Sequence, residues 1–129
     1  MRPWKLKTDI YPIELYLFPP CTREDARKYI ANRFPGVDVR DYFKYEGSIV
    51  VLSHAVTARK VFFIWLEKFN CKDPFAIASL CHEVSHIVGH AFRYLGLPLD
   101  DQASNEHYAY YLGFLVEQCV ALLMKRRRK

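Results

Sequence analysis

Two histidines and a glutamate in the second half of the chain have the types and spacing of a metal site. His82 and His86 are four residues apart in the segment His-Glu-Val-Ser-His. On a helix, such positions lie about 40° apart around the axis and about 6 Å apart along it, so both imidazoles can reach one ion. Glu83 lies beside the pair, where its carboxylate can reach a metal-bound water rather than the metal. The segment therefore predicts a zinc site with its own general base.

A third ligand is available further along the chain. Glu106 would complete a set of two histidines and one glutamate, and the fourth tetrahedral position would remain open for water, as catalytic zinc requires. Asn105 precedes it and can orient backbone or a substrate carbonyl. An alternative interpretation needs no metal: the two histidines lie nearly opposite the apolar stripe of their helix, so they could form its polar face.

Two predicted helices must position these residues. Asp73-Pro74 has the order of a cap followed by a first-turn proline, and Gly96 with Pro98 marks the end of that helix. A second helix is expected from about Gln102 to Met124. The apolar stripe expected on the first helix is Ile77, Cys81, Val84, Val88, Ala91 and Leu95. The buried side expected on the second helix is Ala109, Leu112, Val116 and Leu123.

The first half of the chain is rich in strand signals. A strand is expected within residues 9–18, near a sheet edge because of Pro12, and a helix follows from the Thr22 cap to Pro35-Gly36. Residues 47–52 and 60–66 form two β-branched and aromatic runs, with a turn expected over 53–59. The order β-α-β-β-α-α predicts an α+β fold with a small, mostly antiparallel sheet packed on the two C-terminal helices.

Composition limits the remaining choices. The chain has 129 residues, of which 51% are hydrophobic, so one packed domain over 1–124 is expected. The net charge of +5 equals the charge of the basic tail 125–129, so nucleic acid is not an expected partner. No run approaches the roughly 18 apolar residues of a membrane span. Four cysteines without a CxxC pair indicate reduced, mostly buried thiols and a cytoplasmic protein; they are Cys21, Cys71, Cys81 and Cys119.

The HExxH motif followed by Asn105-Glu106 resembles the signature of the gluzincin metallopeptidases. Nineteen residues separate His86 from Glu106, which is similar to the thermolysin branch. The resemblance covers about residues 60–117. It implies a minimal zincin-like fold, Zn²⁺ as the metal, His82, His86 and Glu106 as its ligands, and Glu83 as the base. The compact arrangement also looks like small HExxH proteins encoded in bacteriophage genomes.

The sequence departs from that family at one instructive position. Thermolysin-like enzymes place an aspartate four residues after the ligand glutamate, where it holds a ligand histidine, and here that residue is Tyr110. The larger family members also use a further subdomain to supply a transition-state-stabilising side chain. Tyr110 is the first candidate for that role, followed by His90 and His107. Otherwise a protein partner would have to complete the cleft.

Three functions remain open on this basis. The first is a zinc-dependent metallopeptidase that hydrolyses peptide bonds with a metal-bound water and Glu83 as general base. The second is a catalytically inactive, zincin-like metal-binding protein with a regulatory or interaction role. The third is a metal-free interaction protein that docks an acidic partner through residues 125–129. The run Val61–Trp65 is either an edge strand that holds an extended peptide substrate or an ordinary central strand.

Overall fold

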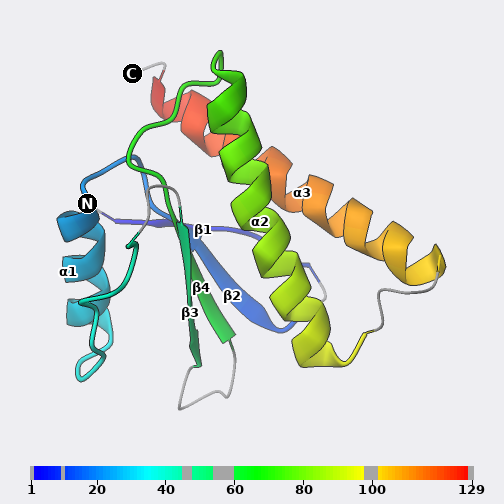
Figure 1. The fold of residues 1–129 in the computed structure, drawn as a ribbon, viewed down its shortest axis with the longest axis horizontal. Helices are drawn as coiled ribbons and strands as arrows, with labels where there is room; N and C mark the ends of the chain where they lie inside the picture. Colours follow the sequence, from blue (N-terminus) through cyan, green and yellow to red (C-terminus); the bar gives the residue numbers. More distant parts are fainter. Residues whose placement is uncertain (1, 10, 45–47, 54–59, 98–101, 128–129) are drawn as a thin grey trace.

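The computed structural model describes residues 2–9, 11–44, 48–53, 60–97 and 102–127, and these form an α+β fold (Figure 1). This confirms the predicted class and adds a short N-terminal strand to the predicted order of elements. Most of the turn expected over 53–59 lies outside the described residues. The elements are β1 (Trp4–Lys5), β2 (Ile13–Leu17), α1 (Arg23–Arg33), β3 (Ser48–Ser53), β4 (Lys60–Trp65), α2 (Pro74–Leu95) and α3 (Gln102–Arg127).

The sheet is mixed, with the strand order β1-β2-β4-β3. β1 pairs with β2 and β3 pairs with β4 in antiparallel fashion, whereas β2 and β4 are parallel. β4 therefore has a strand on each side, which settles the open question about Val61–Trp65 in favour of a central strand. β2 is also an inner strand, so the edge position expected from Pro12 is wrong. Pro12 precedes the first paired residue, Ile13, and its missing N–H therefore removes no ladder bond.

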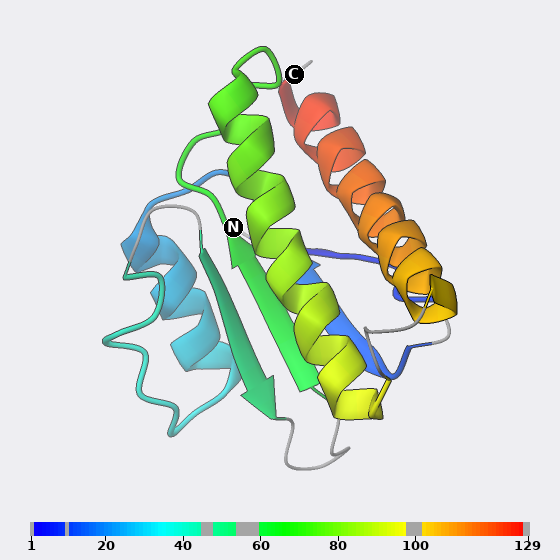
Figure 2. The same ribbon diagram turned by 45° about the vertical axis from the view of Figure 1, so that its right-hand side comes forward.

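Helices cover both faces of the sheet, which explains why β4 is apolar at successive positions. Val61, Phe63 and Trp65 pack with α1 residues in one core cluster. Phe62 and Ile64 point to the other face and pack with α2 in a second cluster. Figures 1 and 2 show α1 on one side of the sheet and α2 on the other.

α3 lies beside α2 rather than directly on the sheet (Figure 2). Its buried residues belong to the same core cluster as those of β2 and α2, and it also contacts the N-terminal segment. Tyr111 stacks on Tyr11 with ring centroids 4.1 Å apart, and its hydroxyl donates to the Thr8 carbonyl at 3.0 Å. Gln118 accepts a hydrogen bond from the Lys7 amide at 2.8 Å. The expectation that both C-terminal helices pack on the sheet is thus correct for α2. α3 lies next to α2, in the same helical layer.

The helix ends follow local sequence signals closely. The Thr22 hydroxyl accepts from the Asp25 amide at 3.1 Å, and Asp73 accepts from the Phe75 amide at 3.0 Å. Gly96 ends α2 in the left-handed conformation, with a φ of 70°. These caps confirm the predicted limits of α1 and α2. α3 continues to Arg127, so part of the basic segment predicted as a tail is helical.

The buried faces of the two long helices differ from the predicted ones. On α2, Val84, Val88 and Ala91 are buried as expected, but Leu95 is exposed and Ile77 and Cys81 are half-buried. The other buried α2 residues are Leu80, Ile87 and Phe92.

Among the α3 side chains that the structure describes, residues 105–125, the buried ones are Tyr111, Leu115, Cys119 and Leu123. Of the predicted set, Ala109 is exposed, and Leu112 and Val116 are half-buried. At 100° per residue, the observed face is turned by roughly 70° from the predicted one. The reason is that α3 carries apolar residues on every side, so their spacing does not define a single face.

Two further expectations concern the cysteines and the membrane. None of the four cysteines forms a disulfide, but only Cys119 is buried and the other three are half-buried, so the expectation of mostly buried thiols is wrong for those three. Within the described residues, none of the helices combines the length and apolarity needed to span a bilayer.

Candidate metal site

His82 and His86 are brought together on the outer side of α2. Their Nε2 atoms lie 3.1 Å apart, and their rings are 4.7 Å apart at an interplanar angle of 84°. Two imidazole nitrogens on one tetrahedral zinc, each about 2.0–2.1 Å from it, would be separated by about 3.3 Å. In the structure this contact is a hydrogen bond between the two imidazoles, so an ion would bind by replacing it and turning both nitrogens toward itself. We refer to His82 and His86 as the histidine pair.

The register of α2 explains why the histidine pair faces outward. Val84 is fully buried in the core, and each histidine is two residues away from it. Two residues correspond to about 160° around a helix, so both imidazoles lie on the far side from the core. Both side chains are exposed. The pair therefore occupies the polar face of an amphipathic helix, and the same placement leaves both nitrogens accessible to an ion.

Glu83 and His90 lie on one flank of α2, between the outer face and the sheet. Glu83 is half-buried, and it follows His82 directly in the chain. The His90 ring is 6.2 Å from Phe62, and its Nδ1 is 3.4 Å from an Arg93 guanidinium nitrogen. Burial, and then the nearby positive charges beginning with Arg93, lower the pKa of His90. A neutral imidazole is thus favoured beside the histidine pair.

Glu106 is placed away from the histidine pair by the rotation of α3. The Tyr108 ring faces α2: its hydroxyl donates to the Ser85 carbonyl at 3.0 Å and lies 2.6 Å from the Ser85 hydroxyl oxygen. Glu106 is two residues before Tyr108, so it points about 160° away from the side that touches α2. Its exposure agrees with this placement.

Tyr110 has the same outward placement. It is two residues after Tyr108 and is 75% exposed. Asn105 and His107 are exposed as well. None of these α3 side chains is held against α2 as Tyr108 is. The structure therefore offers no support for Tyr110 as a group that contacts a substrate at the histidine pair.

The expected three-ligand set is therefore assembled only in part. Across the portion of the chain that the structure describes, no three His, Cys, Asp or Glu side chains gather closely enough to hold a metal ion. Two of the three predicted ligands converge, and Glu106 does not. The physical reason is the turned face of α3, which puts Tyr108 rather than Glu106 against α2.

The outer stripe of α2 has two members that the sequence analysis did not single out. Phe75 and Ser79 precede the histidine pair at positions 75, 79, 82 and 86, a spacing that keeps all four residues on one helix face. Both line a pocket at the beginning of α2. The available signal was Phe75 itself, a large apolar residue at a position where the helical pattern predicts a solvent-facing side chain.

Comparison with known proteins gives no independent assignment. No protein-family model, curated protein or solved structure matches the chain. The resemblance to gluzincins therefore depends on the HExxH motif, the spacing to Asn105-Glu106 and the geometry of the histidine pair.

Proposed function

We propose that this protein is a zinc-dependent metallopeptidase in which the histidine pair holds the metal and Glu83 is the general base. The observation that carries the proposal is the 3.1 Å separation of the Nε2 atoms of the two exposed histidines. This separation is close to the distance of about 3.3 Å between two nitrogen ligands of a tetrahedral zinc ion. Zinc is the expected ion because imidazole nitrogens favour it and because it is available in cells.

The proposed chemistry assigns one role to each residue. His82 and His86 bind the ion through Nε2. A bound zinc ion would supply a Lewis acid that activates water and polarises a carbonyl group. Glu83, next to His82, accepts a proton from the attacking water and passes it to the leaving amine. Peptide bonds are the substrate class that the resemblance to gluzincins implies.

Glu106 can become the third ligand only if the first turns of α3 rotate. That rotation breaks the two interactions between Tyr108 and Ser85. Each such hydrogen bond contributes about 1 kcal/mol to stability. Complete structural zinc sites in small peptides gain on the order of 10 kcal/mol or more from the metal. That energy is shared among all the ligands of a site, and the rotation also separates the Tyr108 ring from Phe92, 5.5 Å away. Glu106 therefore joins the site only if its share of the binding energy exceeds the cost of the rotation.

A second function is favoured by the placement of α3. Glu106 and Tyr110 both point outward, so the protein could bind a metal through the histidine pair without forming a hydrolytic centre. It would then be the regulatory or interaction protein named above, with the metal stabilising α2. This alternative keeps the metal and assigns no role to Glu83.

Metal content and peptide hydrolysis, measured together, test both functions. Protein purified without chelators should contain zinc and cleave an unstructured protein such as casein. Glu83→Gln should keep the zinc and lose hydrolysis, whereas His82→Ala should lose both. Equal hydrolysis by the wild type and Glu83→Gln would remove the proposed base. Stoichiometric zinc with no hydrolysis by any variant would favour the second function.

A further inference from the structure

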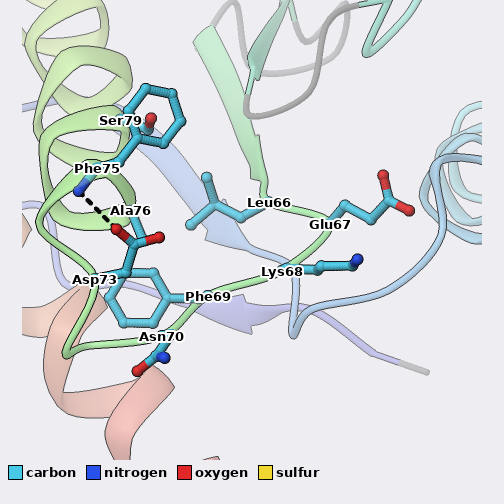
Figure 3. A pocket seen from close by; sticks show the side chains of 9 residues that line it. All are labelled: Leu66, Glu67, Lys68, Phe69, Asn70, Asp73, Phe75, Ala76 and Ser79. Carbon is cyan, nitrogen blue, oxygen red and sulfur yellow. Dashed lines mark hydrogen bonds between the residues drawn. The ribbon is translucent and has the colours of Figure 1, made fainter.

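A pocket lies where β4 leads into α2. It has a volume of about 410 Å³. Its apolar lining comes from both sides: Leu66 and Phe69 from the segment after β4, and Phe75 and Ala76 from the first turn of α2. Figure 3 shows the Leu66 side chain pointing toward α2, while those of Glu67 and Lys68 extend away from the helix. The pocket therefore has an apolar part, made by Leu66, Phe69, Phe75 and Ala76, and a polar part on the helix side, made by Asp73 and Ser79.

Phe75 is the most unusual residue of this pocket. It is 78% exposed, although a phenylalanine side chain gains about 2–3 kcal/mol from burial. Its backbone is fixed, because its amide donates to the Asp73 carboxylate at 3.0 Å (Figure 3). Leu66 beside it is buried in the main core, so the pocket has a firm floor. An exposed aromatic side chain at the rim of a firm apolar pocket is typical of a ligand site.

Two residues of the pocket, Phe75 and Ser79, lie on the same face of α2 as the histidine pair, whereas Ala76 is about 100° further around the helix. Ser79 and Phe75 are about five and nine residues before the midpoint of the pair. At 1.5 Å per residue, they lie about 7.5 and 13.5 Å from that midpoint along the helix axis. An extended peptide advances about 3.3 Å per residue, so these distances correspond to two to four residues.

We propose that this pocket binds a large apolar side chain of the peptide substrate, about three residues from the bond that is cleaved at the histidine pair. Phe75 would stack on or cover that side chain, and Leu66, Phe69 and Ala76 would form the floor. Leucine, methionine and phenylalanine fit this apolar part of the lining. This inference rests on the proposed peptidase function, and its test therefore has one part that does not require hydrolysis.

The first part measures specificity with zinc-loaded protein. A cleaved peptide is varied from leucine to serine at each of the three positions on either side of the scissile bond. Wild type should lose about tenfold or more in kcat/KM at one of the outer positions. Phe75→Ala should abolish that preference and cleave the serine peptide at the wild-type rate. Tyr94→Ala, an exposed aromatic near the other end of α2, is the matched control and should keep the preference.

The second part measures binding without zinc. N-acetyl-phenylalanine amide is titrated into zinc-free protein, and the amide signals of Ala76 and Ser79 are followed by NMR. They should shift in wild type and Tyr94→Ala, and should not shift in Phe75→Ala. If cleavage occurs without side-chain preference and no signal shifts, the pocket is not a substrate site. If the signals shift as expected but the wild type cleaves nothing, the pocket stands and the peptidase function is wrong.

Discussion

Replacing one histidine of the pair should abolish zinc-dependent stabilisation of the fold. An ion that binds only the folded chain stabilises it by about 2.7 kcal/mol when its free concentration is a hundred times its Kd. For a domain of 129 residues, each kcal/mol raises Tm by about 3–5 °C, so zinc should raise the Tm of the wild type by about 10 °C. His86→Ala should remove that increase at the same zinc concentration, because a single imidazole remains.

The zinc-free proteins supply the reference for this measurement. His86 is exposed, so its replacement by alanine should change the zinc-free stability by no more than about 0.5 kcal/mol. His107→Ala is the matched control, since His107 is also exposed but lies on α3. Scanning calorimetry of the three proteins, each with and without zinc, gives all six Tm values. A His86→Ala variant whose Tm rises with zinc as much as that of the wild type would refute the two-histidine site.

Three further predictions concern the framework that carries the site. Gly96→Ala should destabilise the protein by about 1 kcal/mol in urea unfolding, because alanine tolerates a φ of 70° poorly although its Cβ would meet no neighbour; an unchanged midpoint would contradict this cap. Tyr108→Phe should cost about 2 kcal/mol in the zinc-free protein, since it removes both hydrogen bonds to Ser85 and keeps the ring against Phe92; no loss would mean that this contact does not hold α3. Burial raises the pKa of the Cys119 thiol to about 12, so at pH 8 it should be alkylated more slowly than the other three cysteines. Mass spectrometry of the labelled protein measures these rates, and fast labelling of Cys119 would place it at the surface.

Features set by nearby residues could be predicted from the sequence. The limits of α2 followed from Asp73, Pro74 and Gly96, whose effects reach only a few residues. The convergence of His82 and His86 followed from helix geometry alone. The parallel pairing of β2 with β4 could not be predicted in this way, because it joins segments more than forty residues apart and no local turn specifies it.

The rotation of α3 is the feature that sequence reasoning missed, and it decides the candidate site. Spacing alone predicted that Ala109 faces inward, whereas Tyr111 and Leu115 do so. The structure selects that face through tertiary contacts: Tyr111 binds the N-terminal segment, and Tyr108 binds Ser85. Glu106 consequently turns outward, although its distance along the chain from His86 suits a ligand.

X-ray absorption at the zinc edge tests the central claim most directly, because it reports the atoms bound to the metal. With zinc added at one equivalent, the spectrum should show a shell of nitrogen and oxygen at about 2.0–2.1 Å. The scattering from the imidazole rings should correspond to two histidine ligands in the wild type and to one in His82→Ala. A sulfur shell at about 2.3 Å would instead assign the metal to the cysteines. That result, or an imidazole signal that His82→Ala leaves unchanged, would contradict the histidine pair as the metal site.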